Sequence, residues 1–439
     1  MDRRDFLKLC SAAGLGVVGT QMAGTTPVDA APLNNLPLMI GMNLSGGWEH
    51  TMFATPKGDA VNAEGWFIND PVTAYSVADI QTAGNIDYPG IDTNSLFYNS
   101  WYERMTVFRG IDMQTNGHDT GQRHMWSGRL PDNSPCFAAL YAAATAPDAP
   151  LAFVTNGGYD STFGVPVSKT RLGNTERLFP LIYPNRLNAE DENSALYHSE
   201  ETFKRILATR QARLDTMRQS QYLPSLKRSM GLLYTSRLGM SELGKITEYI
   251  QFFENNGGLG DGLARQGKIL LAAHKAGLAA VGTMSMGGYD THGNTDQSTR
   301  DRLTTLVAGV NETLNAAYDL HAYDGGSGPP PVMMLIGSDF GRTPQYNGGM
   351  GKDHWSVGAN ILVDLTEQIP GNRVIGDTDE FLRYKKINPD TLAEDPSGVA
   401  IKPGHIHKWL RHITGIEDHD VVKLFPTDVE EFIDFSQPV

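Results

Sequence analysis

The chain has 439 residues, of which 40% are hydrophobic and 20% charged, and it carries a formal net charge of −14. This composition is typical of a folded globular protein and excludes a largely disordered chain. The negative charge argues against a nucleic acid as the partner. Length alone does not decide between one large domain and two smaller ones.

The first residues resemble a twin-arginine export signal. Arg3 and Arg4 precede a modestly apolar stretch at 9–22, and small residues follow at 27–31. Because the apolar stretch is short and rich in Gly, Ala and Ser, we expect a cleaved signal peptide at 1–31 and no membrane span in the mature chain. The expected partner is the twin-arginine export machinery, and the expected location is the periplasm or another exported compartment.

Short apolar runs that suit buried strands recur along the chain, at 37–44, 105–111, 151–155, 279–286, 332–336 and 360–364. Helical patterns at 263–275 and 296–321 lie between some of these runs, and the tail at 404–410 predicts the start of a further helix. The pattern predicts an α/β protein. A polar and amphipathic region at 195–255, broken by Pro224, predicts two or three helices that form an insertion or cap.

Four loops that follow predicted strands carry side chains of the kind that bind metal ions. They contain Glu49 and His50; His118, Asp119 and Thr120; Asp290, His292 and Asn294; and Asp339 with His354 further along. In an open α/β sheet such loops are where ligands bind. Carboxylates with imidazoles suit zinc, manganese or iron, and carboxylates with amide oxygens suit calcium or magnesium. One such loop is weak evidence, but their recurrence predicts a metal site.

The segment at 116–128 predicts a helix that Asp119 or Thr120 caps and Gly128 ends. A hydroxyl at the start of a helix can serve only as a cap. The same position has backbone donors and the helix dipole, which favour an anion, as a nucleophile attacking phosphate or sulfate requires. Both interpretations of Thr120 stay open.

Taken together, the loop motifs resemble the exported bacterial family of unknown function numbered 1501, which is grouped with alkaline phosphatases, sulfatases and phosphopentomutase-like enzymes. The motifs are Gly46-Gly47, Gly-His-Asp-Thr at 117–120, Gly-Tyr-Asp-Thr-His-Gly-Asn at 288–294, Ser-Asp-Phe-Gly-Arg-Thr-Pro at 338–344 and Gly-Lys-Asp-His-Trp at 351–355. The resemblance covers nearly the whole mature chain. It implies one alkaline phosphatase-like domain over 32–439, with a largely parallel sheet flanked by helices and a metal-centred site.

The resemblance also implies roles for single residues. Thr120, preceded by Asp119, matches the nucleophile, and Asp290 and His354 match metal ligands. Asp339 matches the carboxylate of a Ser-Asp-His-Gly motif and is also expected to bind the metal. His292 or Asn294 is expected to complete the ligand set, and Glu49 or His50 replaces the usual Asp after the first strand. Arg342 is expected to hold the anion's oxygens with its guanidinium fork, unless it forms a structural ion pair.

Phe340 is a further departure from the family pattern, because it occupies the place of the histidine that binds the second metal and cannot act as a ligand. The expected function is hydrolysis of a small anionic phosphate or sulfate ester, with a divalent metal that is zinc, calcium, magnesium or manganese. The alternative is a catalytically degenerate relative that acts as a periplasmic or cell-surface binding or assembly protein with one structural metal.

Overall fold

The computed structural model describes residues 36–172, 179–189, 191, 193–223 and 243–437. The predicted signal peptide at 1–31 and the part of the predicted helical region at 224–242 lie outside these residues. No helix within the described segments is long and apolar enough to cross a membrane.

A central eight-stranded sheet organises the fold. Its spatial order is β12 (Arg373–Ile375), β4 (Met105–Asp112), β11 (Val357–Asp364), β8 (Val332–Ser338), β1 (Leu38–Leu44), β7 (Val281–Met286), β5 (Phe153–Thr155) and β6 (Lys169–Arg171). Neighbouring strands are parallel, except that β11 runs antiparallel to both β4 and β8. The predicted largely parallel sheet is therefore confirmed.

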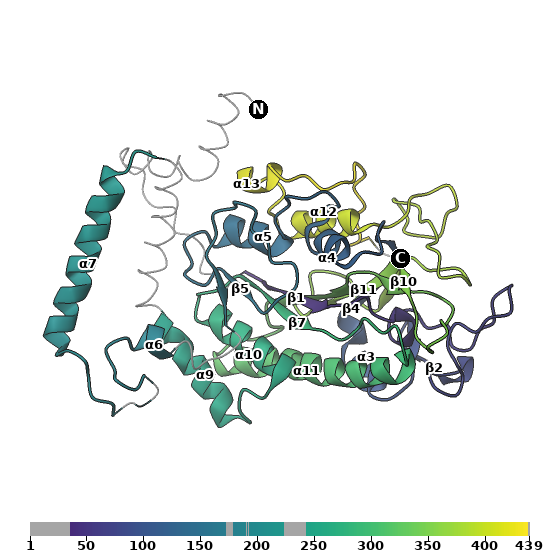
Figure 1. The fold of residues 1–439 in the computed structure, drawn as a ribbon, viewed down its shortest axis with the longest axis horizontal. Coiled ribbons are helices and arrows are strands. Elements are labelled where there is room, and N and C mark those ends of the chain that lie inside the picture. The colour runs from purple at the N-terminus through teal and green to yellow at the C-terminus, as the bar shows by residue number, and fades with distance from the viewer. Residues whose placement is uncertain (1–35, 173–178, 190, 192, 224–242, 438–439) are drawn as a thin grey trace.

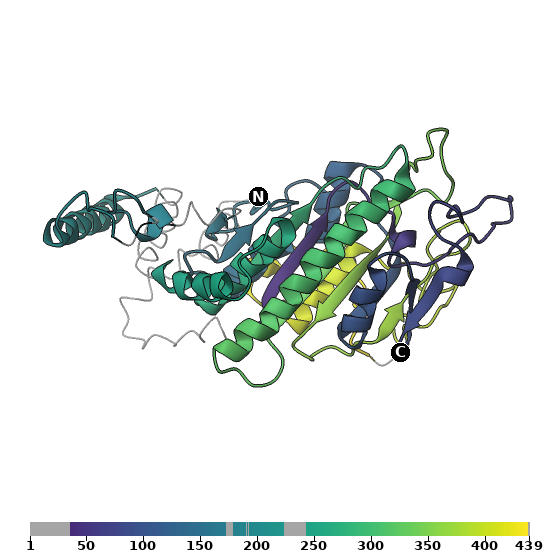
Figure 2. The ribbon, with the colours of Figure 1, turned by 90° about the horizontal axis from the view of Figure 1, so that it is seen from below.

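Helices cover both faces of this sheet (Figure 1). One layer contains α4 (His118–Ser127), α5 (Phe137–Thr145), α12 (Pro403–Ile413) and α13 (Asp420–Lys423), and the other contains α3 (Asn94–Trp101), α9 (Ile246–Asn255), α10 (Gly262–Lys275) and α11 (Thr295–Tyr323). Figure 2 shows the long α11 lying along the sheet. Small elements complete the fold: α6 (Phe179–Ile182), the pair β2 (Ile80–Ala83) and β3 (Ile86–Pro89), and the pair β9 (Gly341–Arg342) and β10 (His354–Trp355).

Alternate side chains of the central strands enter two separate hydrophobic cores. In β1, Ile40 and Met42 belong to the core under α10 and α11, whereas Met39 belongs to the core under α4, α5 and α12. Gly41 faces α4, and a Cβ built there would lie 2.9 Å from the ring of Trp126. Strands with apolar side chains on both faces are typical of a parallel sheet between helix layers, which is why they were recognisable as apolar runs.

The predicted helical region at 195–255 contains α7 (Glu200–Ser220) and α9 among the described residues. Figure 1 shows α7 standing away from the sheet, at the opposite end of the molecule from β10. This helix therefore does not cover the end of the sheet where β10 lies.

The start of α4 differs from the prediction. The helix begins at His118, and its N-cap is Gly117 in an extended conformation, so neither Asp119 nor Thr120 is the cap. Both are already within the first helical turn. The predicted end is confirmed, because Gly128 takes a left-handed conformation with φ of 69°.

Candidate metal centre

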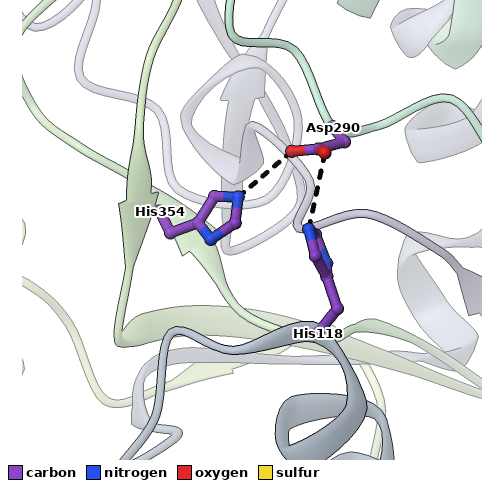
Figure 3. A group of neighbouring side chains, drawn as sticks. All are labelled: His118, Asp290 and His354. Carbon is purple, nitrogen blue, oxygen red and sulfur yellow. Dashed lines mark hydrogen bonds and ion pairs between the residues drawn. The ribbon is translucent and has the colours of Figure 1, made fainter.

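Side chains from four segments meet at the carboxyl edge of the central sheet. Asp290 follows β7, Asp339 follows β8, His118 opens α4 after β4, and His354 lies in β10 just before β11. Because β11 is antiparallel to its neighbours, its start lies at the edge where β4 and β8 end. Figure 3 shows the Asp290 carboxylate between the imidazoles of His118 and His354. These three side chains could share a metal ion, because their ligand atoms lie within 4.8 Å of one another.

His292 approaches the same oxygen of the Asp290 carboxylate as His354 does. Asp290 Oδ1 is 3.0 Å from His292 Nε2 and 3.1 Å from His354 Nε2, and the two Nε2 atoms are 3.0 Å apart. Three ligand atoms spaced in this way can each lie about 2.0–2.2 Å from one cation above their triangle. The structure therefore brings three of the predicted ligands, Asp290, His292 and His354, together as neighbours.

The charge on Asp290 suits a cation. Burial raises its pKa, but hydrogen bonds from Arg342 and His354 outweigh that effect and lower the pKa to about 2. Asp290 is therefore ionised at neutral pH and offers an anionic ligand.

His118 is held by the carboxylate of Asp339. His118 Nδ1 lies 2.8 Å from Asp339 Oδ2, and its Nε2 lies 3.4 Å from Asp290 Oδ2. A carboxylate bound to one ring nitrogen fixes the tautomer, so that the other nitrogen can bind a metal. Asp339 has no exposed surface and also accepts a hydrogen bond from the Gly46 amide at 3.2 Å. Its Oδ1 is buried without a hydrogen-bond partner among the described residues, which favours a cation close by.

These contacts change two predicted roles. Asp339, expected to be a ligand, binds His118 through Oδ2 and orients its ring, whereas His118 was absent from the predicted ligand set. The signal for His118 was present in the sequence, because it is the histidine of the Gly-His-Asp-Thr motif after a strand. Phe340 is buried and packs on the rings of His118 and His354, with centroids 5.0 and 4.5 Å away. Phe340 therefore packs directly against two of the candidate ligands.

The comparisons with known proteins identify the chain only at the level of a family. Residues 38–397 match a family described as "Protein of unknown function (DUF1501)". The chain belongs to DUF1501. No curated protein matches it.

Some solved structures are similar to this DUF1501 chain at low TM-scores. Ps i-CgsB in complex with k-i-k-neocarrahexaose has a TM-score of 0.37 at 8% identity, covering 90% of this chain and 75% of that chain. BT1596, a 2-O GAG sulfatase, has 0.32 at 9% identity, covering 87% and 71%. TAB5 alkaline phosphatase, as a mutant with Mg bound, has 0.31 at 9% identity, covering 77% and 94%.

In this DUF1501 protein the predicted anion-binding Arg342 is a buried structural residue. Its guanidinium has no exposed surface and donates to the carbonyl oxygens of Gly46, Gly47, Tyr289 and Lys352. It also lies 2.8 Å from Asp290 Oδ1. Because the N–H groups of Arg342 are hydrogen-bonded to protein oxygens, its guanidinium does not face a substrate. The structural ion pair is therefore the better description of Arg342. It holds the loop after β1, the loop after β7 and the segment before β10 together.

Glu49 and His50 do not reach the group around Asp290. Glu49 forms a fully buried ion pair with Lys352 at 2.8 Å. His50 is also fully buried, and neither ring nitrogen has a hydrogen-bond partner in the described part of the chain. Burial lowers the pKa of His50 to about 4, so this ring is neutral at pH 7. Both side chains therefore belong to the buried interior of this DUF1501 protein.

Asp119 and Thr120 lie in the first turn of α4, and neither side chain forms a hydrogen bond or ion pair with another described residue. His118 contacts the Asp339 carboxylate, and Gly121 packs on the Asp339 backbone, so both face the sheet. At about 3.6 residues per turn, positions 119 and 120 point away from that shared direction.

Asn294 is also separate from the site. It is exposed in a left-handed conformation, with φ of 47°, and is the N-cap position of α11.

Proposed function

We propose that this DUF1501 protein is a metal-dependent hydrolase of phosphate or sulfate esters. The observation that carries the proposal is the convergence of Asp290 Oδ1, His292 Nε2 and His354 Nε2 within 3.0–3.1 Å of one another. His118 approaches the other oxygen of the same carboxylate. A single carboxylate surrounded by imidazoles suits zinc or manganese better than calcium or magnesium, which prefer oxygen ligands.

The residues of the chain prepare the site for this chemistry. When bound, a divalent metal would polarise the ester and stabilise the negative charge that develops as it is attacked. Asp339 orients His118, and Arg342 orients Asp290, so these side chains need little rearrangement. The buried Phe340 shields one side of His118 and His354 from water.

Metal content is the direct test. We expect the purified mature protein to hold about one equivalent of zinc or manganese, measured by elemental analysis, and to lose ester hydrolysis when a chelator removes it. Protein that is folded but takes up no zinc, manganese, calcium or magnesium would refute the proposal.

The nucleophile is a separate question. Because Thr120 points away from the side of α4 that carries His118, the helical spacing favours direct attack by water over a covalent step at Thr120. We expect Thr120→Ala to retain most of its turnover of phosphate and sulfate esters. A loss of more than about 100-fold with metal binding intact would instead assign the nucleophile to Thr120.

A catalytically degenerate binding protein is the second candidate. Phe340, which fills the place of a second-metal histidine, favours it. Such a protein would bind its metal yet turn over no ester in a panel of phosphate and sulfate substrates.

We also propose export through the twin-arginine pathway, which rests on Arg3, Arg4 and the short apolar stretch at 9–22. In cells, Arg3→Lys with Arg4→Lys should retain the precursor in the cytoplasm. Normal export of that variant would contradict this assignment.

A further inference from the structure

A polar cavity of about 420 Å³ lies beside Asp290 and His292. Its other wall comes from α11, through Ser298, Asp301 and Arg302. Glycines and Thr291 complete the lining, so among the described residues no purely hydrocarbon side chain lines the cavity. A molecule bound here would touch the candidate metal ligands and α11 at the same time, and its contacts would be polar.

Arg302 places a free guanidinium in this cavity. Its side chain is exposed and forms no hydrogen bond or ion pair with any other described residue. It lies against the backbone of Gly288, where a Cβ would come within 2.6 Å of Nε and 2.8 Å of Cζ. A side chain at position 288 would therefore displace the guanidinium, and Gly288 lies two residues before Asp290. An unpaired guanidinium offers a planar fork of donors that matches the oxygens of phosphate or sulfate.

Two other arginines, Arg342 and Arg123, already have protein partners for their guanidinium groups. Arg342 is buried among protein oxygens, and Arg123 is ion-paired with Asp132 and donates to the Leu130 carbonyl. Arg302 differs from both because its donors face the cavity.

We propose that Arg302 binds the anionic group of the substrate and that the cavity selects esters of hydrophilic alcohols, such as a polyol or sugar phosphate or sulfate. This proposal rests on the proposed function and adds its substrate class. The anion would lie between the metal site and Arg302, while hydroxyl groups of the alcohol would find polar partners in the lining. An alkyl or aryl group would find little apolar surface there, because the lining is mostly polar.

Asp301 limits how tightly an anion binds. Its Oδ1 accepts a hydrogen bond from Gln297 at 2.8 Å, and its negative charge also faces the cavity. Removing that charge should strengthen the binding of an anion, whereas removing Arg302 should weaken it. These opposite effects distinguish electrostatic recognition from a structural role of the α11 surface.

The test measures the affinity of metal-loaded protein for inorganic phosphate and sulfate by calorimetry. Losing charge-assisted hydrogen bonds should weaken binding about 10- to 100-fold in Arg302→Ala. Arg302→Lys should lie between, because a lysine keeps the charge and loses the fork, and Asp301→Asn should bind more tightly than the wild type. Arg205→Ala, on the exposed surface of α7, is the control and should bind as the wild type does.

Three outcomes separate the claims. If metal uptake is normal and Arg302→Ala binds both anions as tightly as the wild type, the inference about Arg302 is wrong and the proposed function stands. If metal-loaded wild type binds neither anion, or prefers long-chain alkyl esters to polyol esters in kcat/KM, the inference is also wrong. If the wild type takes up no metal, the proposed function itself fails.

Discussion

The carboxylate of Glu49 lies 2.8 Å from the ammonium of Lys352, and neither side chain has any exposed surface. Burial opposes ionisation of Glu49, but Lys352 outweighs it and holds the pKa of Glu49 below its usual range. The pair joins the loop after β1 to the segment that carries His354, so it fixes the frame on which the site is built.

Removing one member of this pair should destabilise the protein strongly. Lys352→Met leaves an uncompensated buried carboxylate and is expected to cost ~3–5 kcal/mol in the free energy of unfolding. The double variant Glu49→Gln with Lys352→Met should recover much of that loss, because no buried charge remains. Denaturant titration of the three proteins measures this, and equal stability of Lys352→Met and the wild type would contradict it.

Arg342→Lys should damage the frame rather than substrate binding alone. A lysine cannot serve the several carbonyl oxygens that the guanidinium reaches, and each buried acceptor left without a donor costs ~1–3 kcal/mol. We expect a lower free energy of unfolding together with weaker metal binding. Arg383→Lys is the matched control, because Arg383 lies over the ring of Phe381 at 4.8 Å, outside the contacts of the site. If Arg342→Lys left the free energy of unfolding unchanged but raised the KM for an ester substrate, Arg342 would instead bind the anion of the substrate.

His118→Ala should lower metal affinity by at least about tenfold, because a ligand is lost. Asp339→Ala should lower it about 10- to 100-fold by freeing the His118 ring. Competition with a chelator measures both, and His412→Ala, whose ring pairs with Glu417 on the surface, serves as the control. Full affinity in His118→Ala would leave only the Asp290, His292 and His354 triangle as the site.

Phe340→His should test whether Phe340 limits the site to one metal ion. An imidazole at this position would lie beside His118 and His354, in the place that Phe340 now fills. We expect the metal content to rise towards two equivalents per chain. Phe340→Leu, which changes volume without adding a ligand, should keep one equivalent. If both variants bind the same amount of metal, Phe340 does not limit the stoichiometry.

Stability should fall in mild acid because of a buried histidine between α4 and α12. His407 donates from Nε2 to the Met125 carbonyl at 2.6 Å, and burial lowers its pKa to about 3. The unfolded chain takes up this proton below about pH 6.5, whereas the folded protein does not. His407 therefore favours unfolding as the pH falls from about 6.5 towards 3. His407→Gln should reduce the slope of unfolding free energy against pH in this window, and an unchanged slope would contradict the assignment.

The sequence predicted most of the central sheet because its strands bury apolar side chains on both faces. It did not predict the direction of β11, since the run at 360–364 looks the same whichever way it pairs. The short edge strands β6 and β12 were also missed, because β6 is polar and β12 has only two apolar residues, so neither forms an apolar run.

The location of the site could be predicted from the sequence, but the roles of several of its residues could not. Asp290 and His292 come soon after the apolar run at 279–286, so their loop could be recognised locally, whereas His354 lies further from the run that precedes it. The roles of Arg342 and Glu49 depend on partners far away in sequence, such as Gly46 for Arg342 and Lys352 for Glu49. From the sequence alone, a charged residue in a predicted loop cannot be distinguished from a functional group. The structure shows that Arg342 and Glu49 are instead buried and bound to other protein groups.

The reversed direction of β11 has a consequence for how the site is assembled. β8 ends and β11 begins at the same edge of the sheet. Asp339 and His354 therefore lie on one short connecting segment, which contains β9 and β10. Parallel neighbours would need a crossover helix at this point. The candidate centre thus receives two of its segments from a single continuous stretch of chain, in which a change of loop length would shift His354 while leaving the sheet itself intact.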